Sequence, residues 1–237
     1  FFTDKDLLLF PGLCSMATSV FDLFKIGIGP SSSHTAGPMK AAGLFLQHLP
    51  LFQVNRVQVD LYGSLGLTGN GHGSDKAVLL GLEGEQPETV EIDSIPFRLQ
   101  QIEAQQLLQL NQQHPISFHK KQDLIFHRKQ NLPLHENGLR FQAWDVDGQL
   151  LVERSYYSIG GGFVLEGKGD TLEVVEDQTE LPLPFKKASE LLEICRQQQC
   201  SISQIVLANE QVWHSTEETY RRLLEIWEVM ERCVRLG

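Results

Sequence analysis

The chain has 237 residues and a formal net charge of −10 at pH 7, with 41% hydrophobic and 21% charged residues. These values are typical of a globular protein, and the acidic balance argues against nucleic-acid binding, which requires a basic surface. No segment approaches the run of about 18 apolar residues that a spanning helix needs. We therefore expect a cytoplasmic protein with no membrane association.

Residues 1–15 are expected to be an extraneous extension. They lack a basic region and carry Asp4 and Asp6 ahead of their apolar stretch, which is unlike a secretory signal. Met16 follows immediately, and we expect it to be the natural start.

The four cysteines are Cys14, Cys195, Cys200 and Cys233. Their irregular spacing in a long chain favours free thiols in a reducing compartment over disulfides. Metal binding by Cys195 and Cys200 is a weaker alternative, because no CxxC or Cys/His cluster accompanies them.

The first predicted helix begins near Pro38, with apolar residues recurring at helical spacing through Leu49. Its N-terminus opens onto a loop that carries Ser31, Ser32, Ser33, His34 and Thr35. Hydroxyl and backbone N–H groups at a helix N-terminus form a site for a carboxylate or phosphate. A capped turn explains the same residues and is the commoner structure.

A strand is predicted over residues 56–62, where apolar and polar residues alternate. A glycine-rich loop is expected to follow over 63–73, and a second helix to start at Ser74 or Asp75. Strand, glycine-rich loop and helix in this order are typical of α/β binding sites.

His72 is the candidate general base, because an imidazole titrates near neutral pH. Gly71 lets a ligand or backbone approach closely, and Asp75 is a candidate to orient the ring. A solvated surface turn is the alternative for this motif.

Further along, we predict a surface helix over 98–113, a short hairpin over 116–127, and a hairpin turning at Asp147-Gly148. The glycines of 158–162 favour a bend over a site, and 166–180 is expected to be an exposed connection. His135 and Glu136 are potential metal ligands, but a turn is the better interpretation because adjacent side chains point in different directions.

After residue 181 the pattern becomes purely helical, with capping boxes beginning at Ser201 and Ser215. Aromatic residues in the last helix lie at spacing expected for core packing. The predicted fold class is therefore α/β (mixed α+β) over 16–180, followed by an all-helical segment over 181–237.

Several stretches resemble bacterial iron–sulfur L-serine dehydratases, and they occur in the same order. They are SVFDLFKIGIGPSSSHTAGPMKAA, YGSLGLTGNGHGSDKA, PETVEIDSIP, NLPLHENGLRF and YYSIGGGF. The helical part is similar to the start of that family's α domain, which points to the single-chain form of the enzyme.

This resemblance implies a lyase of amino-acid catabolism and gluconeogenesis that converts L-serine to pyruvate and ammonia. The family uses a [4Fe–4S] cluster as a Lewis acid toward the serine hydroxyl. By resemblance, residues 31–35 would hold the substrate, with Gly71 and Asp75 nearby. His72 would be the base, with His34 as the second candidate.

The resemblance also implies a missing part. The family's cluster cysteines lie in the C-terminal part of the α domain, so we expect no metal ligands in this chain. We expect a truncated or split product, inactive alone, that requires the remaining α-domain half and forms a homodimer when complete. The alternative is a non-catalytic anion-binding regulatory module, since the β domain also resembles the substrate-sensing domain of some phosphoglycerate dehydrogenases.

Overall fold

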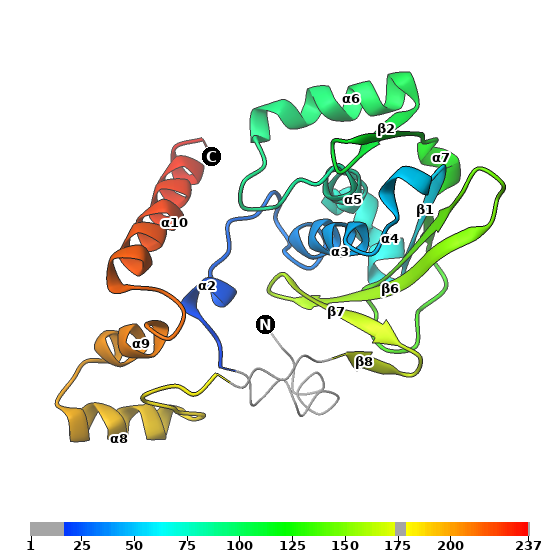
Figure 1. Ribbon diagram of the computed structural model, residues 1–237. Coiled ribbons are helices and arrows are strands. Elements are labelled where there is room, and N and C mark those ends of the chain that lie inside the picture. Colours follow the sequence, from blue (N-terminus) through cyan, green and yellow to red (C-terminus); the bar gives the residue numbers. More distant parts are fainter. Residues whose placement is uncertain (1–16, 174–178, 237) are drawn as a thin grey trace. The chain divides into compact units, whose positions relative to one another are not determined.

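The computed structural model describes residues 17–173 and 179–236 (Figure 1). The predictions for residues 1–15, Cys14 and Met16 lie outside the described residues. The described chain forms two compact units, one of residues 27–173 and one that combines 17–26 with 179–236. Residues 17–26, which the sequence placed in the α/β domain, thus group with the C-terminal helices.

The first unit is built on a mixed six-stranded sheet, which confirms the predicted mixed α/β class. Its strand order is β4 (Leu124–His127), β1 (Arg56–Tyr62), β5 (Gly138–Trp144), β6 (Leu150–Gly160), β7 (Phe163–Lys168) and β8 (Thr171–Glu173). β1 pairs in parallel with β4 and antiparallel with β5. The remaining neighbours pair antiparallel, so β5 to β8 form a meander.

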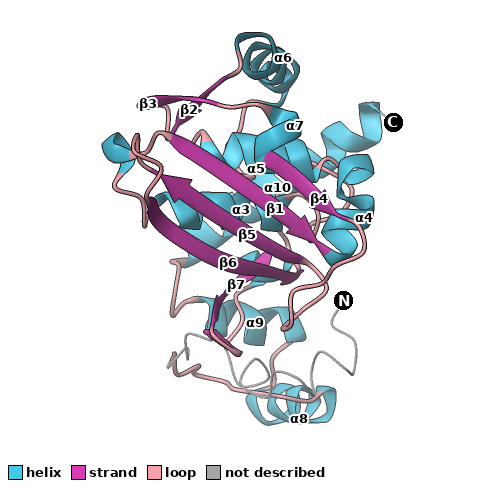
Figure 2. Ribbon diagram, turned by 90° about the vertical axis from the view of Figure 1, so that its right-hand side faces the viewer, coloured by secondary structure: helices cyan, strands magenta, loops and turns pink. Residues whose placement is uncertain are grey.

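Helices of this unit lie behind the sheet in Figure 2 and cover one of its faces. They are α3 (Ala36–Leu46), α4 (Gly63–His72) and α5 (Ser74–Leu82). Val57, Val59 and Leu61 of β1 are fully buried in the core, as the alternating pattern predicted. Asp60 lies on the opposite face, where its carboxylate accepts a hydrogen bond from His127 Nε2 at 2.6 Å.

The remaining elements of this unit are short helices and a two-stranded pair. They are the short 3₁₀ helices η2 (Leu51–Gln53) and η3 (Ile92–Ser94), α6 (Ile95–Gln105), the two-stranded pair β2 (Leu107–Leu110) and β3 (His114–Ser117), and α7 (Lys120–Asp123).

Residues 63–72 of the glycine-rich segment form a helix, so the predicted loop is wrong. Its glycines allow close backbone packing: a Cβ at Gly63 would meet Glu136 O at 2.0 Å, and one at Gly66 would meet His127 O at 2.5 Å. Tertiary contacts thus override the low helix propensity of glycine. Gly73, at φ +84°, ends α4 and precedes α5, which begins at Ser74 as predicted.

The predicted helix over 98–113 and hairpin over 116–127 are also wrong in part. α6 ends at Gln105, and β2 then buries Leu108 and Leu110 completely against β3. β4 joins β1 in parallel instead of pairing with β3. Burial of these leucines and long-range strand pairing decide the outcome, and neither is visible in local sequence.

The expected connection over 166–180 instead contains a hairpin of β7 and β8, which turns at Gly169 with φ +62°. The hairpin of β5 and β6 at Asp147-Gly148 is confirmed, with Gly148 at φ +78°. Gly161 and Gly162 have positive φ between β6 and β7, which confirms their role as a bend.

The second unit is helical, consisting of α2 (Val20–Leu23), α8 (Ala188–Gln198), α9 (Ile202–Glu210) and α10 (Thr216–Leu236). The capping box at Ser201 is confirmed, and Ser215 Oγ accepts a hydrogen bond from the Glu218 N–H at 3.2 Å. Trp227 of α10 is 58% exposed, so the predicted core packing of this residue is not achieved within the described chain. None of the described helices is both long enough and apolar enough to cross a bilayer.

Candidate functional site

The serine loop before α3 is organised by its own backbone. Ser31 O accepts hydrogen bonds from the N–H groups of His34 and Thr35, and Ser32 O accepts one from Gly37 N–H. Thr35 is buried, and its hydroxyl donates to Ser31 O at 2.7 Å. Several donors expected to bind an anion are therefore occupied within the loop, whereas the Ser32 side chain is exposed.

The imidazole of His34 lies between two pairs of hydroxyl groups. Its Nδ1 is 3.0 Å from Ser33 Oγ and 3.4 Å from Ser31 Oγ. Its Nε2 is 3.2 Å from Ser64 Oγ and 3.1 Å from Thr68 Oγ1, both on α4. This ring therefore connects the serine loop to the helix that carries His72.

The hydrogen-bond network indicates which nitrogen of His34 carries the proton. The Thr68 hydroxyl donates to Ser64 O at 2.9 Å, so its oxygen is free to accept from the His34 Nε2–H. Nδ1 then accepts from the Ser33 hydroxyl. Burial lowers the pKa of His34 below 6.5, and the neighbouring His72 lowers it further, while Ser64 and Glu136 act in the opposite direction. A neutral ring suits this site.

His72 is the last residue of α4 and is exposed to solvent. Its ring centroid lies 5.0 Å from that of His34, so the structure brings the two predicted histidines together. Gly71 is exposed beside it, and a Cβ there would meet no atom within 4 Å. A ligand therefore has open access to this end of α4.

Asp75 does not orient His72 in this structure. Its carboxylate is buried and accepts a hydrogen bond from Lys120 Nζ at 2.7 Å through Oδ2. Oδ1 is also buried and has no hydrogen-bond partner in the described part of the chain. Its neighbour Ser74 instead contacts the site, since the Ser74 hydroxyl donates to His34 O at 2.6 Å.

Two further motifs lie against the same region. The Ser64 N–H donates to Glu136 O at 3.0 Å, which places the LPLHENG segment against the start of α4. Ser158 packs on Gly37 of α3 so closely that a Cβ at Gly37 would lie 2.0 Å from Ser158 Oγ. Segments far apart in sequence therefore form one cluster around the serine loop and α4.

Sequence reasoning missed Ser64, Thr68 and Ser74. Ser64 and Thr68 are four residues apart, which places them on one face of a helix. That signal was available only if residues 63–72 had been recognised as helical.

The described residues do not fit an iron–sulfur cluster. Cys195 and Cys200 are partly exposed thiols, Cys233 is exposed, and no cluster of three or more His, Cys, Asp or Glu side chains suited to a metal occurs among the described residues. The same finding gives no support to a metal site at His135 and Glu136 within the described chain.

Comparison with known proteins identifies the family. Residues 19–169 match the model of the serine dehydratase beta chain, so the chain belongs to this family. It is 47% identical over 227 residues to an L-serine dehydratase of Streptomyces coelicolor, covering 94% of this chain and 50% of that protein. It is 42% identical over 223 residues to L-serine dehydratase 1 of Escherichia coli, covering 92% of this chain and 49% of that protein. The chain thus spans about half the length of the curated relatives it matches.

Proposed function

We propose that this chain forms the substrate-binding and proton-accepting part of an L-serine ammonia-lyase. The observation that carries the proposal is the pairing of His34 and His72 beside the serine loop, in a member of the serine dehydratase beta chain family. The relatives named L-serine dehydratase support L-serine as the substrate.

In this proposal the two histidines have different roles. His72 accepts the α-proton of serine, because it is exposed and lies next to open space at Gly71. His34 holds the loop against α4, because both its ring nitrogens already face hydroxyl groups. Ser32, with its exposed side chain, is the leading contact for the substrate carboxylate.

The proposed reaction is a dehydration of serine followed by hydrolysis of the resulting imine. Serine loses its α-proton to His72 and its hydroxyl group as hydroxide, which gives aminoacrylate. The proton held by His72 passes to the departing hydroxide, which releases water and restores neutral His72. The aminoacrylate tautomerises to an imine, and water converts the imine to pyruvate and ammonia. No redox step is involved.

Activation of the serine hydroxyl is the chemistry that a [4Fe–4S] cluster would supply. Since the described cysteines do not fit such a cluster, we place its ligands outside this part of the chain and assign no step to them here. The complete enzyme is proposed to act as a cytoplasmic homodimer.

Replacement of His72 tests the proposed base. In the complete, cluster-loaded enzyme, His72→Ala should lower kcat by about 10²–10⁴-fold, the usual contribution of a positioned acid–base group. KM should change much less, because in this proposal the carboxylate of the substrate is bound by Ser32 and not by His72. Ser32→Ala should show the opposite bias and raise KM more than it lowers kcat.

Iron and sulfide must be quantified in each variant, because loss of the cluster would mimic loss of the base. His48→Ala is a matched control, since His48 is an exposed histidine whose Nε2 lies 3.7 Å from the Glu166 carboxylate, away from the serine loop and α4 in sequence. A cluster-loaded His72→Ala enzyme with near-parental kcat would show that His72 is not the base.

A further inference from the structure

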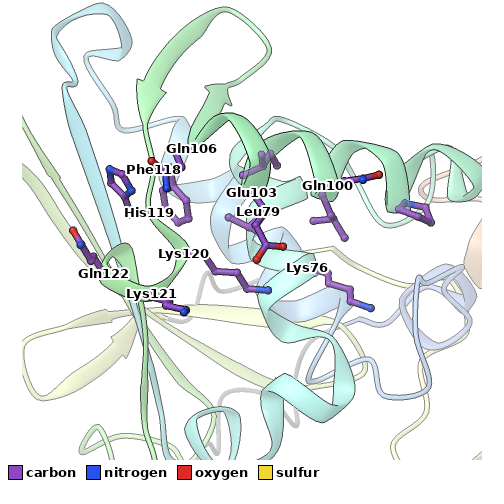
Figure 3. A pocket seen from close by; sticks show the side chains of 13 residues that line it. Lys76, Leu79, Gln100, Glu103, Gln106, Phe118, His119, Lys120, Lys121 and Gln122 are labelled. Atoms are coloured by element: carbon purple, nitrogen blue, oxygen red, sulfur yellow. The ribbon is translucent and has the colours of Figure 1, made fainter.

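Nucleophilic side chains outside the histidine cluster include lysines of the sheet unit and thiols of the helical unit. Lysines line a cavity of about 630 Å³ between α5, α6 and α7 (Figure 3). There the buried carboxylate of Asp75 holds Lys120 as an ammonium ion at 2.7 Å, and an ammonium ion is not a nucleophile. The thiols of Cys195 and Cys200, in contrast, are free and partly exposed. They are therefore open to thiol chemistry.

The two cysteines occupy paired positions in the turn that ends α8. Gln199 adopts the left-handed conformation, with φ +52°, and turns the chain back toward the helix. The Cys200 N–H donates to Cys195 O at 3.1 Å, and the Gln199 N–H donates to Arg196 O at 3.4 Å. These two hydrogen bonds define a Schellman motif, whose first and last residues frequently bring their side chains into contact. In this chain both of those residues are cysteine.

The main-chain hydrogen bond also limits the distance between the cysteines. One carbonyl group, this hydrogen bond and one N–Cα bond join the two Cα atoms, so they lie at most about 7 Å apart. A disulfide joins Cα atoms that are about 4.4–6.8 Å apart. The Cys200 thiol points back toward the helix, because it donates to Gln198 O at 3.2 Å. A disulfide between Cys195 and Cys200 therefore requires little movement of the backbone.

The residue after Cys200 holds it in place from the other side. Ser201 begins α9, and its hydroxyl accepts a hydrogen bond from the Gln204 N–H at 3.3 Å. The Ser201 N–H donates in return to Gln204 Oε1 at 2.8 Å. Cys200 thus lies between a closed helix end and a capped helix start. A backbone fixed in this way raises the effective concentration of one thiol at the other, because less entropy is lost when they join.

We propose that Cys195 and Cys200 form a reversible disulfide site that a low-molecular-weight disulfide oxidises. The thiolate of one cysteine attacks the S–S bond of the reagent, which gives a mixed disulfide and releases one reagent thiolate. The thiolate of the other cysteine then attacks the mixed disulfide, so the Cys195–Cys200 bond forms and the second reagent thiolate leaves. The two protons lost by the cysteines pass to the two released thiolates. Two protein thiols are oxidised and one reagent disulfide is reduced.

Equilibration of the 237-residue chain with glutathione and glutathione disulfide tests the proposal. After acid quenching, mass spectrometry of the peptides that contain Cys195 and Cys200 measures the fraction joined. A synthetic peptide of residues 190–205 is the reference, because it has the same local sequence without the fold. The equilibrium constant for disulfide formation in the chain should exceed that in the peptide by at least about tenfold, since the turn already holds the cysteines together.

Variants separate the effect of the turn from proximity in sequence. Gln199→Gly adopts the left-handed conformation without steric cost, whereas the β-branched side chain of Gln199→Val opposes it. The equilibrium constant of the glycine variant should therefore exceed that of the valine variant by at least about threefold. Cys233→Ser is the matched control, because it removes an exposed thiol on α10 of the same unit. Its equilibrium constant should stay within about twofold of the parent value.

Oxidation should also slow hydrogen exchange of the Cys200 N–H by at least about tenfold, because the new bond keeps it beside its acceptor. Cys195→Ser should stop at the mixed disulfide of Cys200 with glutathione. An equilibrium constant equal to that of the peptide would overturn the proposal, and so would pairing of either cysteine with Cys14 or Cys233. Circular dichroism of each variant shows whether its helices are retained. No measurement here uses lyase activity, so the result is independent of the outcome for His72.

Discussion

Each ring nitrogen of His34 faces two hydroxyl groups, and burial beside a second imidazole favours its neutral form. A protonated ring would need both nitrogens to donate, but the ring is buried and lies next to a second imidazole. The hydroxyls accept or donate as required, so the neutral ring is satisfied at lower cost. The site thus contains two neighbouring histidines of different character: His34 is buried and neutral, and His72 is exposed.

We predict that His34 titrates below pH 6.5 in the folded chain, because burial and His72 both lower its pKa. Since the folded pKa lies below the unfolded value, the stabilising contribution of neutral His34 is complete above pH 6.5. It should be lost as the pH falls through the unfolded pKa toward the folded one.

The measurement is a proton–nitrogen NMR titration of the His34 ring, with a peptide of residues 31–37 as the unfolded reference. A His34→Asn variant should show a weaker loss of stability between neutral and acidic pH than the parent chain. A titration of His34 at or above that of the peptide would contradict the prediction.

Helix α4 shows how glycine can support an element that it intrinsically disfavours. Glycine is about 1 kcal/mol less favourable than alanine in a helix interior. At Gly66, however, an added Cβ would lie 2.5 Å from His127 O and 2.8 Å from Leu61 O. These are backbone atoms of neighbouring strands and turns, so the helix can approach them only without a side chain.

Gly66→Ala should therefore destabilise the sheet unit by about 1–3 kcal/mol, the usual cost of overpacking, despite the better helix propensity of alanine. Gly71→Ala is the matched control in the same helix, because its Cβ would meet nothing within 4 Å. It should be neutral or stabilise by up to about 1 kcal/mol. Thermal or denaturant unfolding of both variants measures the difference, and equal effects would refute the packing argument.

Across the whole molecule, the helical unit is assembled from both ends of the described chain. Glu210, which is 2% exposed, accepts hydrogen bonds from Ser19 Oγ at 2.7 Å and from the Val20 N–H at 2.9 Å. His214 Nδ1 lies 3.0 Å from the same carboxylate. One buried carboxylate thus joins α2 to α9 across 190 positions of sequence.

Glu210→Ala should destabilise the attachment of α2 by about 2–4 kcal/mol, because it leaves buried donors without an acceptor. Hydrogen–deuterium exchange measures this directly, since residues 17–26 should lose protection. Glu210→Gln preserves the shape and an acceptor oxygen and should cost less. Strands β1 and β5 of the other unit are the internal reference, and equal loss of protection there would point to global unfolding instead.

The sequence by itself determined the elements whose signals are local. Alternating apolar residues predicted β1, the Asp147-Gly148 turn predicted the β5–β6 hairpin, and the Ser201 capping box predicted the start of α9. It also singled out His34 and His72, and the collinear motifs indicated a family that the comparisons confirm. These features depend on residues close together in the chain.

Only the tertiary structure decided how those elements combine. Residues 63–72 form a helix, and β4 pairs in parallel with β1. Asp75 accepts a hydrogen bond from Lys120 instead of orienting His72, and the His34 ring contacts the hydroxyls of Ser64 and Thr68. Each of these outcomes depends on close approach between segments far apart in sequence. These contacts stabilise the fold through burial of apolar side chains and through hydrogen bonds, and some of them form only where a glycine has no Cβ. Local propensity cannot predict this contribution to the free energy of folding.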